Sequence, residues 1–141
     1  MPRVDFYILN AADEEQRQIY LCRIVDKAFG LGHRIWIHTA QGGADALDAR
    51  LWTFSQGSFL PHERADNLDA AECAVVLGDG APPDSDRALL INDDTAVPAF
   101  AADFERIAEI IDQSEATRRR GRERYVHYRD QGFDLRTHRL G

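Results

Sequence analysis

The stretch RVDFYILNAADEEQRQIYLCRIVDKAFGLGHRIWIH, residues 3–38, decides the fold of this chain. Residues 3–9 alternate in polarity and then become continuously apolar, which is typical of a strand partly covered on both faces. Asp13 is a helix-capping residue, and the apolar residues behind it recur at helical spacing, which predicts a helix over about residues 13–30. Residues 33–38 are a second strand candidate. The stretch therefore predicts a strand, a helix and a strand joined by short turns.

The same alternation continues through the chain. The segment TAQGGADALDARLWTF, residues 39–54, predicts a second helix, and the short apolar runs within residues 72–80 and 87–94 are typical of buried strands. Pro98 precedes a set of apolar residues at helical spacing, which predicts an amphipathic helix: Phe100, Phe104, Ile107, Ala108 and Ile111. A last helix is expected from about residue 115 to 131, ending at Gly132 before an extended tail.

This order of elements predicts an α/β fold. Strands that alternate with helices through short connections favour parallel pairing, so we expect one domain over residues 1–141 with a mainly parallel sheet flanked by helices. Such a fold is Rossmann-like, and its members often bind nucleotides at the carboxyl ends of their strands. The length of 141 residues and the 44% hydrophobic content suit one domain of this kind.

Charge is distributed unevenly along the chain. The formal net charge is −7, but eight arginines and four acids give residues 113–141 a net charge of +4, which leaves −11 for the remainder. A body this acidic repels a phosphate backbone, so direct DNA binding by the C-terminal arginines is disfavoured. A basic C-terminal groove for an acidic peptide fits this distribution better.

The sequence predicts a cytoplasmic protein without a membrane span. It contains no run of about 18 apolar residues and no signal-peptide cleavage pattern. Cys22 and Cys73 both lie in apolar segments without metal-ligand spacing, so we expect two buried thiols.

The loops do not have the pattern of a nucleotide or metal site. A phosphate cradle needs glycines between a strand and a helix, and the three loops at residues 10–15, 39–45 and 78–84 lack the glycine pattern or carry acids that repel phosphate. Asp93 and Asp94 could bind Mg²⁺, or they could simply end a strand. A small nucleotide- or metal-dependent α/β enzyme remains the alternative to a binding protein.

The last helix carries a candidate binding ridge. Arg118, Arg122, Tyr125 and Arg129 fall on one stripe if residues 115–131 are helical. Guanidinium groups beside a phenol ring suit a peptide that carries carboxylates next to an aromatic residue. The alternative is a solvated helix face with charge pairs between neighbouring turns.

A second candidate surface lies in LWTFSQGSFLPHE, residues 51–63. Trp52 and Phe54 are two positions apart on a predicted helix, so they cannot both face one core, while Phe59 and Leu60 precede a proline. These four residues could form an exposed apolar patch for a partner protein. Alternatively, the aromatic residues fold the loop back onto the helix.

Several segments together resemble a known family. They are DFYIL (5–9), GHRIWIHT (32–39), ALDARLWTFSQGSFLPHE (46–63), INDD (91–94), FERIAEIID (104–112) and RERYVHYRDQGFDL (122–135). In this order they resemble the chi subunit of bacterial DNA polymerase III holoenzyme. The resemblance implies a non-catalytic accessory protein of the clamp loader, with an α/β domain and no nucleotide site, cofactor or metal.

The resemblance also implies two partners. The acidic C-terminal tail of single-stranded-DNA-binding protein is expected at Arg118, Arg122, Tyr125 and Thr137, with Arg118 in place of a lysine frequent in the family. The psi subunit of the clamp loader is expected at Trp52 and Phe59, and another protein such as a repair helicase could use the same aromatic surface.

Overall fold

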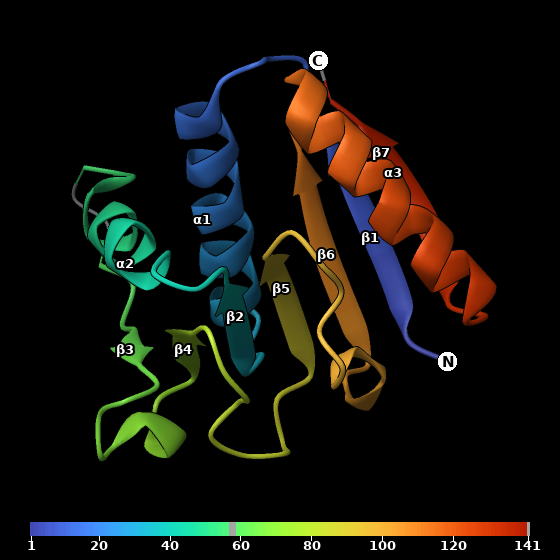
Figure 1. Cartoon of the computed structure of the whole chain (residues 1–141). Coiled ribbons are helices and arrows are strands. Elements are labelled where there is room, and N and C mark those ends of the chain that lie inside the picture. Colours follow the sequence, from blue (N-terminus) through green and yellow to red (C-terminus); the bar gives the residue numbers. More distant parts are fainter. Residues whose placement is uncertain (57–58, 141) are drawn as a thin grey trace.

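Seven parallel strands form one sheet in the order β3-β4-β2-β5-β6-β1-β7 (Figure 1). The computed structural model describes residues 1–56 and 59–140. The strands are β1 (Arg3–Ile8), β2 (Ile35–Thr39), β3 (Glu63–Arg64), β4 (Val75–Gly78), β5 (Leu89–Asp93), β6 (Arg106–Ile111) and β7 (Asp134–Arg139). The predicted α/β fold with a mainly parallel sheet is confirmed, and every strand pairing is parallel.

Helices cover both faces of the sheet. The helices are α1 (Glu14–Gly30), α2 (Ala44–Thr53) and α3 (Glu115–Asp130), and two short 3₁₀ turns lie at Ala70–Glu72 and Ala101–Asp103. Helices α1 and α2 pack on one face, where Leu21 and Leu51 join a cluster with Ile37 of β2. Helix α3 and the connection between β5 and β6 cover the other face, where Tyr128 joins a cluster with Phe104.

Local sequence signals set the ends of α1 and α3 as predicted. The Asp13 carboxylate accepts a hydrogen bond from the backbone N–H of Glu15 at 2.9 Å, which satisfies a free donor at the start of α1. Gly132 follows α3 with φ of +84°, a conformation that favours glycine, and it turns the chain into β7. The expected extended tail is therefore a strand of the sheet.

The prediction of a helix after Pro98 is wrong. Residues 101–103 form only a 3₁₀ turn, and Arg106–Ile111 are strand β6 between β5 and β1. A central parallel strand is buried on both faces, so its residues lack the alternating pattern of a half-exposed strand. Phe100 and Phe104 come from the preceding loop, and their positions completed a helical spacing by coincidence.

The two cysteines differ in burial. Cys22 lies on the buried face of α1, and burial raises the pKa of its thiol to about 12. Cys73 is only partly buried, so the expectation of two buried thiols is correct for Cys22 alone. No helix in the described parts of the chain has both the length and the apolar character needed to cross a bilayer.

Candidate protein-binding groove

A groove of about 410 Å³ lies between α3 and the strands at one edge of the sheet. Its walls come from α3 on one side and from β7 on the other, and the ends of β1 and β6 supply the floor. The residues that line it are Phe6, Ile8, Ile111, Gln113, Arg118, Gly121, Arg122, Tyr125, Thr137 and Arg139. The groove thus joins an apolar floor to a basic rim.

The apolar floor depends on a close approach of α3 to the sheet. Gly121 faces Ile111, and a Cβ atom at this position would lie 2.8 Å from Ile111 Cδ1. Four residues along the helix, the Tyr125 ring packs edge-on against Phe6 with ring centroids 5.3 Å apart. Glycine thus permits the contact, and Tyr125 extends the floor toward solvent.

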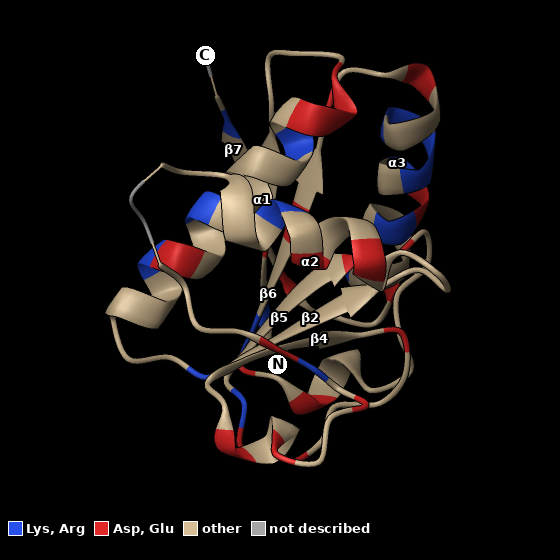
Figure 2. Ribbon diagram, turned by 90° about the vertical axis from the view of Figure 1, so that its left-hand side faces the viewer, with Lys and Arg blue, Asp and Glu red and all other residues tan. Residues whose placement is uncertain are grey.

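The basic rim consists of Arg118, Arg122 and Arg139. Within residues 1–56 and 59–140, no carboxylate oxygen lies within 4.0 Å of the Arg118 or Arg122 guanidinium groups. The alternative was a solvated helix face whose charges pair with one another. Arg118 and Arg122 do not form such pairs within the described residues. The blue segments along α3 in Figure 2 are arginines. An anionic ligand could therefore pair with both arginines without displacing an acid.

A buried polar network holds α3 in place beside the groove. The Glu109 carboxylate of β6 accepts hydrogen bonds from Arg124 Nε at 2.9 Å, Tyr128 Oη at 2.8 Å and Asn92 Nδ2 at 2.8 Å. Burial raises the pKa of Glu109, and burial together with the nearby Glu109 charge raises the pKa of Tyr128. Arg124 therefore faces the core, whereas Arg118 and Arg122 of the same helix line the groove.

A second network holds the other wall. Asp5 of β1 accepts hydrogen bonds from His138 Nε2 at 2.8 Å, Arg106 at 3.0 Å and Arg3 at 2.9 Å. Burial raises the pKa of Asp5, but the hydrogen bonds from His138, Arg106 and Arg3 outweigh this effect and lower it below the ordinary value. His138 therefore ties β7 to the sheet from the face opposite to Thr137.

The structure brings most of the predicted groove residues together. Arg118, Arg122, Tyr125 and Thr137 all line the groove, although Thr137 comes from a different element. Arg129 does not line it: it lies about 10 Å beyond Arg122 along the helix, where it pairs with Asp130. The predicted stripe extends beyond the groove, and Arg129 is not one of the groove residues.

Six lining residues were not predicted from the sequence: four of the floor and helix face, Phe6, Ile8, Ile111 and Gly121, and two polar ones, Gln113 and Arg139. Arg139 reaches the groove because β7 pairs with β1, and Gln113 reaches it because it lies two residues after the end of β6. In the sequence, Arg139 is one of several arginines near the end of the chain. Only the register that places Arg139 opposite Ile8 distinguishes it from the rest.

The aromatic patch lies at the other end of the sheet, on α2 and the segment that follows it (Figure 1). Trp52 and Phe59 are 49% and 69% exposed, with ring centroids 5.7 Å apart. Phe54 is partly buried against the core, and Leu60 is 1% exposed within it. The prediction that Leu60 faces a partner is wrong, because this side chain anchors the segment inward. Residues 57 and 58 lie outside the described residues.

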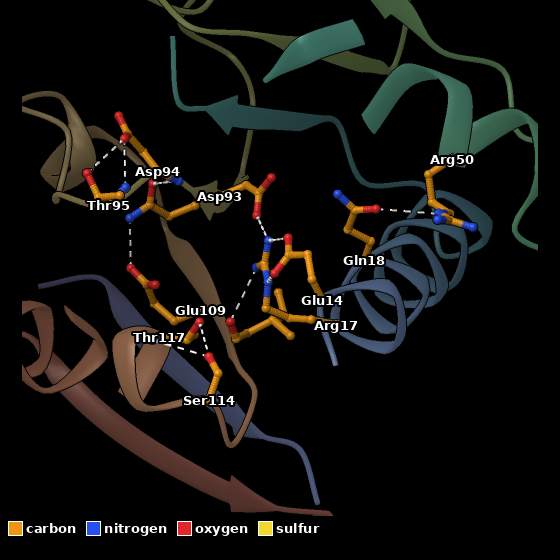
Figure 3. Close-up of polar contacts among 12 residues, drawn as sticks. Glu14, Arg17, Gln18, Arg50, Asp93, Asp94, Thr95, Glu109, Ser114 and Thr117 are labelled. Carbon is orange, nitrogen blue, oxygen red and sulfur yellow. Dashed lines mark hydrogen bonds and ion pairs between the residues drawn. The ribbon is translucent and has the colours of Figure 1, made fainter. Parts of the chain in front are cut away.

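The carboxyl ends of the central strands are filled by a polar cluster (Figure 3). Arg17 of α1 pairs with Asp93 at the end of β5 and with Glu14 at 2.8 Å. Asp94 hydrogen-bonds the backbone N–H of Thr95 at 2.6 Å and lies 3.4 Å from His38 Nε2. Among the described residues, no group of three metal-ligating side chains is arranged to hold an ion. Asp93 and Asp94 thus take part in structural contacts at this edge.

The fold and the groove define a class: a parallel α/β protein that presents a basic, apolar-floored groove on its surface. The chain belongs to the DNA polymerase III chi subunit (HolC) family, whose sequence model matches residues 1–136. The predicted resemblance is confirmed over nearly the whole chain, and membership places the protein among the accessory subunits of DNA replication.

Individual relatives agree with the family. The DNA polymerase III subunit chi of Pseudomonas aeruginosa is 40% identical over 141 residues, covering 99% of this chain and 98% of that protein. The subunit chi of Haemophilus influenzae is 27% identical over 96% of both chains. The subunit chi of Escherichia coli is 29% identical over 83% of this chain and 81% of its own.

A solved structure shares the fold without close sequence similarity. The crystal structure of T4 UvsW superposes with a TM-score of 0.63 over 99% of this chain, at 6% identity. This chain spans only 41% of that longer one. The likeness concerns the backbone arrangement alone.

Proposed function

We propose that this protein is a non-catalytic adaptor of the replication machinery. In this role, the groove between α3 and β7 binds the acidic C-terminal tail of single-stranded-DNA-binding protein. The patch of Trp52 and Phe59 binds the psi subunit of the clamp loader or another protein. Family membership supports a subunit of DNA polymerase III. The observation that carries the tail assignment is a basic groove with an apolar floor on an otherwise acidic chain.

The chemistry of the groove suits a peptide with carboxylates and a terminal aromatic ring. Arg118 and Arg122 stand one helical turn apart on the same face, so each guanidinium can pair with one carboxylate of an extended peptide. The aromatic ring would pack against Phe6 and Tyr125, where apolar surface is already gathered. Acidic residues and a ring on one short peptide would then engage the rim and the floor together.

The placement of the two surfaces supports a bridging role. The groove belongs to the β1 and β7 edge of the sheet, whereas α2 contacts β4 toward the opposite edge. Two partners of moderate size can therefore bind together without competing for space. Because a multimeric DNA-binding protein offers several tails, weak individual contacts can still give high occupancy through avidity.

The tail assignment is tested with a fluorescently labelled acidic peptide ending in Asp-Ile-Pro-Phe. We expect binding by anisotropy at low salt, and at least tenfold weaker binding by Arg122→Glu, because a charge-assisted hydrogen bond contributes about 1.5–3 kcal/mol. Arg129→Glu is the matched control, since it makes the same charge change on α3 outside the groove. Equal binding by the Arg122→Glu variant and the wild type would rule out this groove.

The partner assignment of the aromatic patch is tested by co-expression with the psi subunit of Escherichia coli. We expect Trp52→Ala and Phe59→Ala each to reduce recovery of psi, since a few aromatic anchors often contribute most of the binding energy at protein interfaces. Leu31→Ala, which removes an exposed apolar side chain elsewhere, should leave recovery unchanged. If wild type and variants recover psi equally, the patch does not bind psi.

A further inference from the structure

Strand β7 ends the sheet at the wall of the groove (Figure 1). It pairs with β1 on one side, and among the described residues no strand pairs with its other side. The pairing with β1 runs residue by residue without a bulge, and β7 contains no proline. An open edge of this kind presents backbone donors and acceptors to which a further extended chain can bind.

One set of residues in β7 directs its backbone groups toward β1. The N–H groups of Asp134 and Leu140 donate to carbonyl oxygens of the β1 segment at 3.1 Å and 2.9 Å. Successive residues of a strand direct their backbone groups to alternate sides, so Arg136 and His138 face β1 as well. The backbone groups of these residues are used within the sheet.

The other set of residues faces outward. Leu135, Thr137 and Arg139 occupy the alternate positions, so their N–H and C=O groups point away from the sheet. Their side chains turn to the α3 face, where Thr137 and Arg139 line the groove and Leu135 packs into the core with Tyr128. The same strand thus offers backbone groups at its edge and side chains to the groove.

Charge selects the kind of chain that this edge can bind. Arg139 lies on the edge strand and lines the groove together with Arg118 and Arg122 of α3. A second copy of the protein would add another set of basic residues at this place, and the like charges would repel each other. Acidic side chains on an added strand would instead pair with the arginines. The edge therefore suits an acidic, extended segment.

We propose that the acidic tail adds to the sheet as a further strand on β7 before its terminal ring enters the groove. This inference rests on the proposed function and specifies how the same peptide is held. Neighbouring strands lie about 4.8 Å apart, so a chain paired with β7 runs about 10 Å from β1. Thr137 lies opposite Phe6 in the register, and both line the groove, so the end of the peptide can cross the short Thr137 side chain to reach the floor.

The two kinds of contact have different effects on recognition. Backbone hydrogen bonds to β7 do not depend on the side chains of the peptide and contribute affinity, whereas the arginines select acidic side chains. A flexible tail can be held in this way because the edge strand imposes an extended conformation on it.

The pairing is tested by amide hydrogen exchange, followed by NMR, with and without the acidic peptide ending in Asp-Ile-Pro-Phe. In the free protein, we expect slow exchange at Arg136 and His138 and fast exchange at Thr137 and Arg139. Saturating peptide should slow Thr137 and Arg139 at least tenfold. A peptide that binds while these two amides keep their free rates would overturn strand addition and leave the tail assignment standing. A peptide that does not bind would overturn both.

Peptides methylated at single backbone nitrogens distinguish backbone pairing from simple burial. We expect the loss of affinity to alternate along the residues before the proline. It should be about three- to tenfold where the N–H faces β7, and less than twofold at the next residue, because only alternate residues donate to the edge. Equal losses at successive residues would contradict a paired strand.

Two variants at Arg139 test the protein's side of the pairing. Arg139→Ala and Arg139→Pro both remove the guanidinium group, but only proline also removes the outward N–H. Proline is compatible with this position because β1 does not use that N–H. We expect Arg139→Pro to bind the peptide about three- to tenfold more weakly than Arg139→Ala, with Arg136 and His138 still slow to exchange. Equal affinities would overturn pairing at this end of β7, and if proline loosens the strand, the methylated peptides decide.

Discussion

The arginines of α3 differ in role although the sequence presents them alike. Arg122 lines the groove, Arg124 pairs with the buried Glu109, and Arg129 lies in solvent beside Asp130. Position on the helix decides each role: Arg124 is two positions from Arg122 and points in a different direction, whereas Arg129 is on the side of Arg122 but about two turns farther along. At the residue scale, the nearest acid determines whether an arginine is structural or free to bind a ligand.

The buried Asp5 gives a pH-dependent prediction. Its folded pKa lies below the ordinary value, so its stabilising contribution is present above the unfolded pKa and is lost as the pH falls through the folded one. We expect Asp5→Asn to lower the free energy of unfolding by about 1–3 kcal/mol at neutral pH, with the difference from wild type shrinking below about pH 4.

Urea denaturation over a pH series measures this difference. Asp134→Asn is the control, because its pair with Arg136 is exposed and should contribute little at any pH. A difference between wild type and Asp5→Asn that stays constant down to the most acidic samples would contradict the linkage.

The groove depends on the packing of helix α3 against strand β6. The Glu109–Arg124 ion pair fastens the helix to the strand, and Gly121 lets the two approach closely at Ile111. The groove therefore depends on how one helix is docked, in addition to the residues that face the ligand. Removing either partner of a buried ion pair destabilises the fold, because the other charge is then left buried without compensation.

Removing Arg124 should weaken the whole element. We expect Arg124→Met to lower the free energy of unfolding by about 3–5 kcal/mol, because Glu109 would be left buried without its cation. Arg129→Met makes the same change at an exposed site and should stay within about 0.5 kcal/mol of wild type. Chemical denaturation compares the two, and similar losses from both would show that the buried pair has no special role.

At the scale of the whole molecule, the two candidate surfaces are separated by the width of the sheet. Sites this far apart without shared contacts behave independently. Their chemistry also differs, since the groove is basic and the patch is aromatic. We therefore expect the two partners to respond differently to mutation and to salt.

Crossed measurements test this independence. Trp52→Ala should leave the affinity for the acidic peptide within about twofold of wild type, and Arg122→Glu should leave psi recovery unchanged. Raising the salt concentration should weaken peptide binding and have little effect on psi recovery. A Trp52→Ala variant with strongly reduced peptide affinity would indicate that the surfaces are coupled.

Much of the fold could be predicted, because its local signals are strong. Asp13 and Gly132 mark helix ends through hydrogen bonding and backbone conformation, which depend on few neighbouring residues. The region around β6 could not be assigned correctly, because a strand buried on both faces has no alternating pattern. Leu60 was misplaced for a related reason: its hydrophobicity is compatible with a core or an interface.

The alternation of strands and helices, the family and the basic stripe that contains Arg118 and Arg122 could all be predicted before the fold was known. Each follows from local order, composition or spacing along the chain. Only the folded structure places Arg139 and Gln113 beside that stripe and makes Glu109 the buried anchor behind it. The reason is that β7 pairs with β1 across more than a hundred residues, and such long-range pairing depends on packing of the whole sheet.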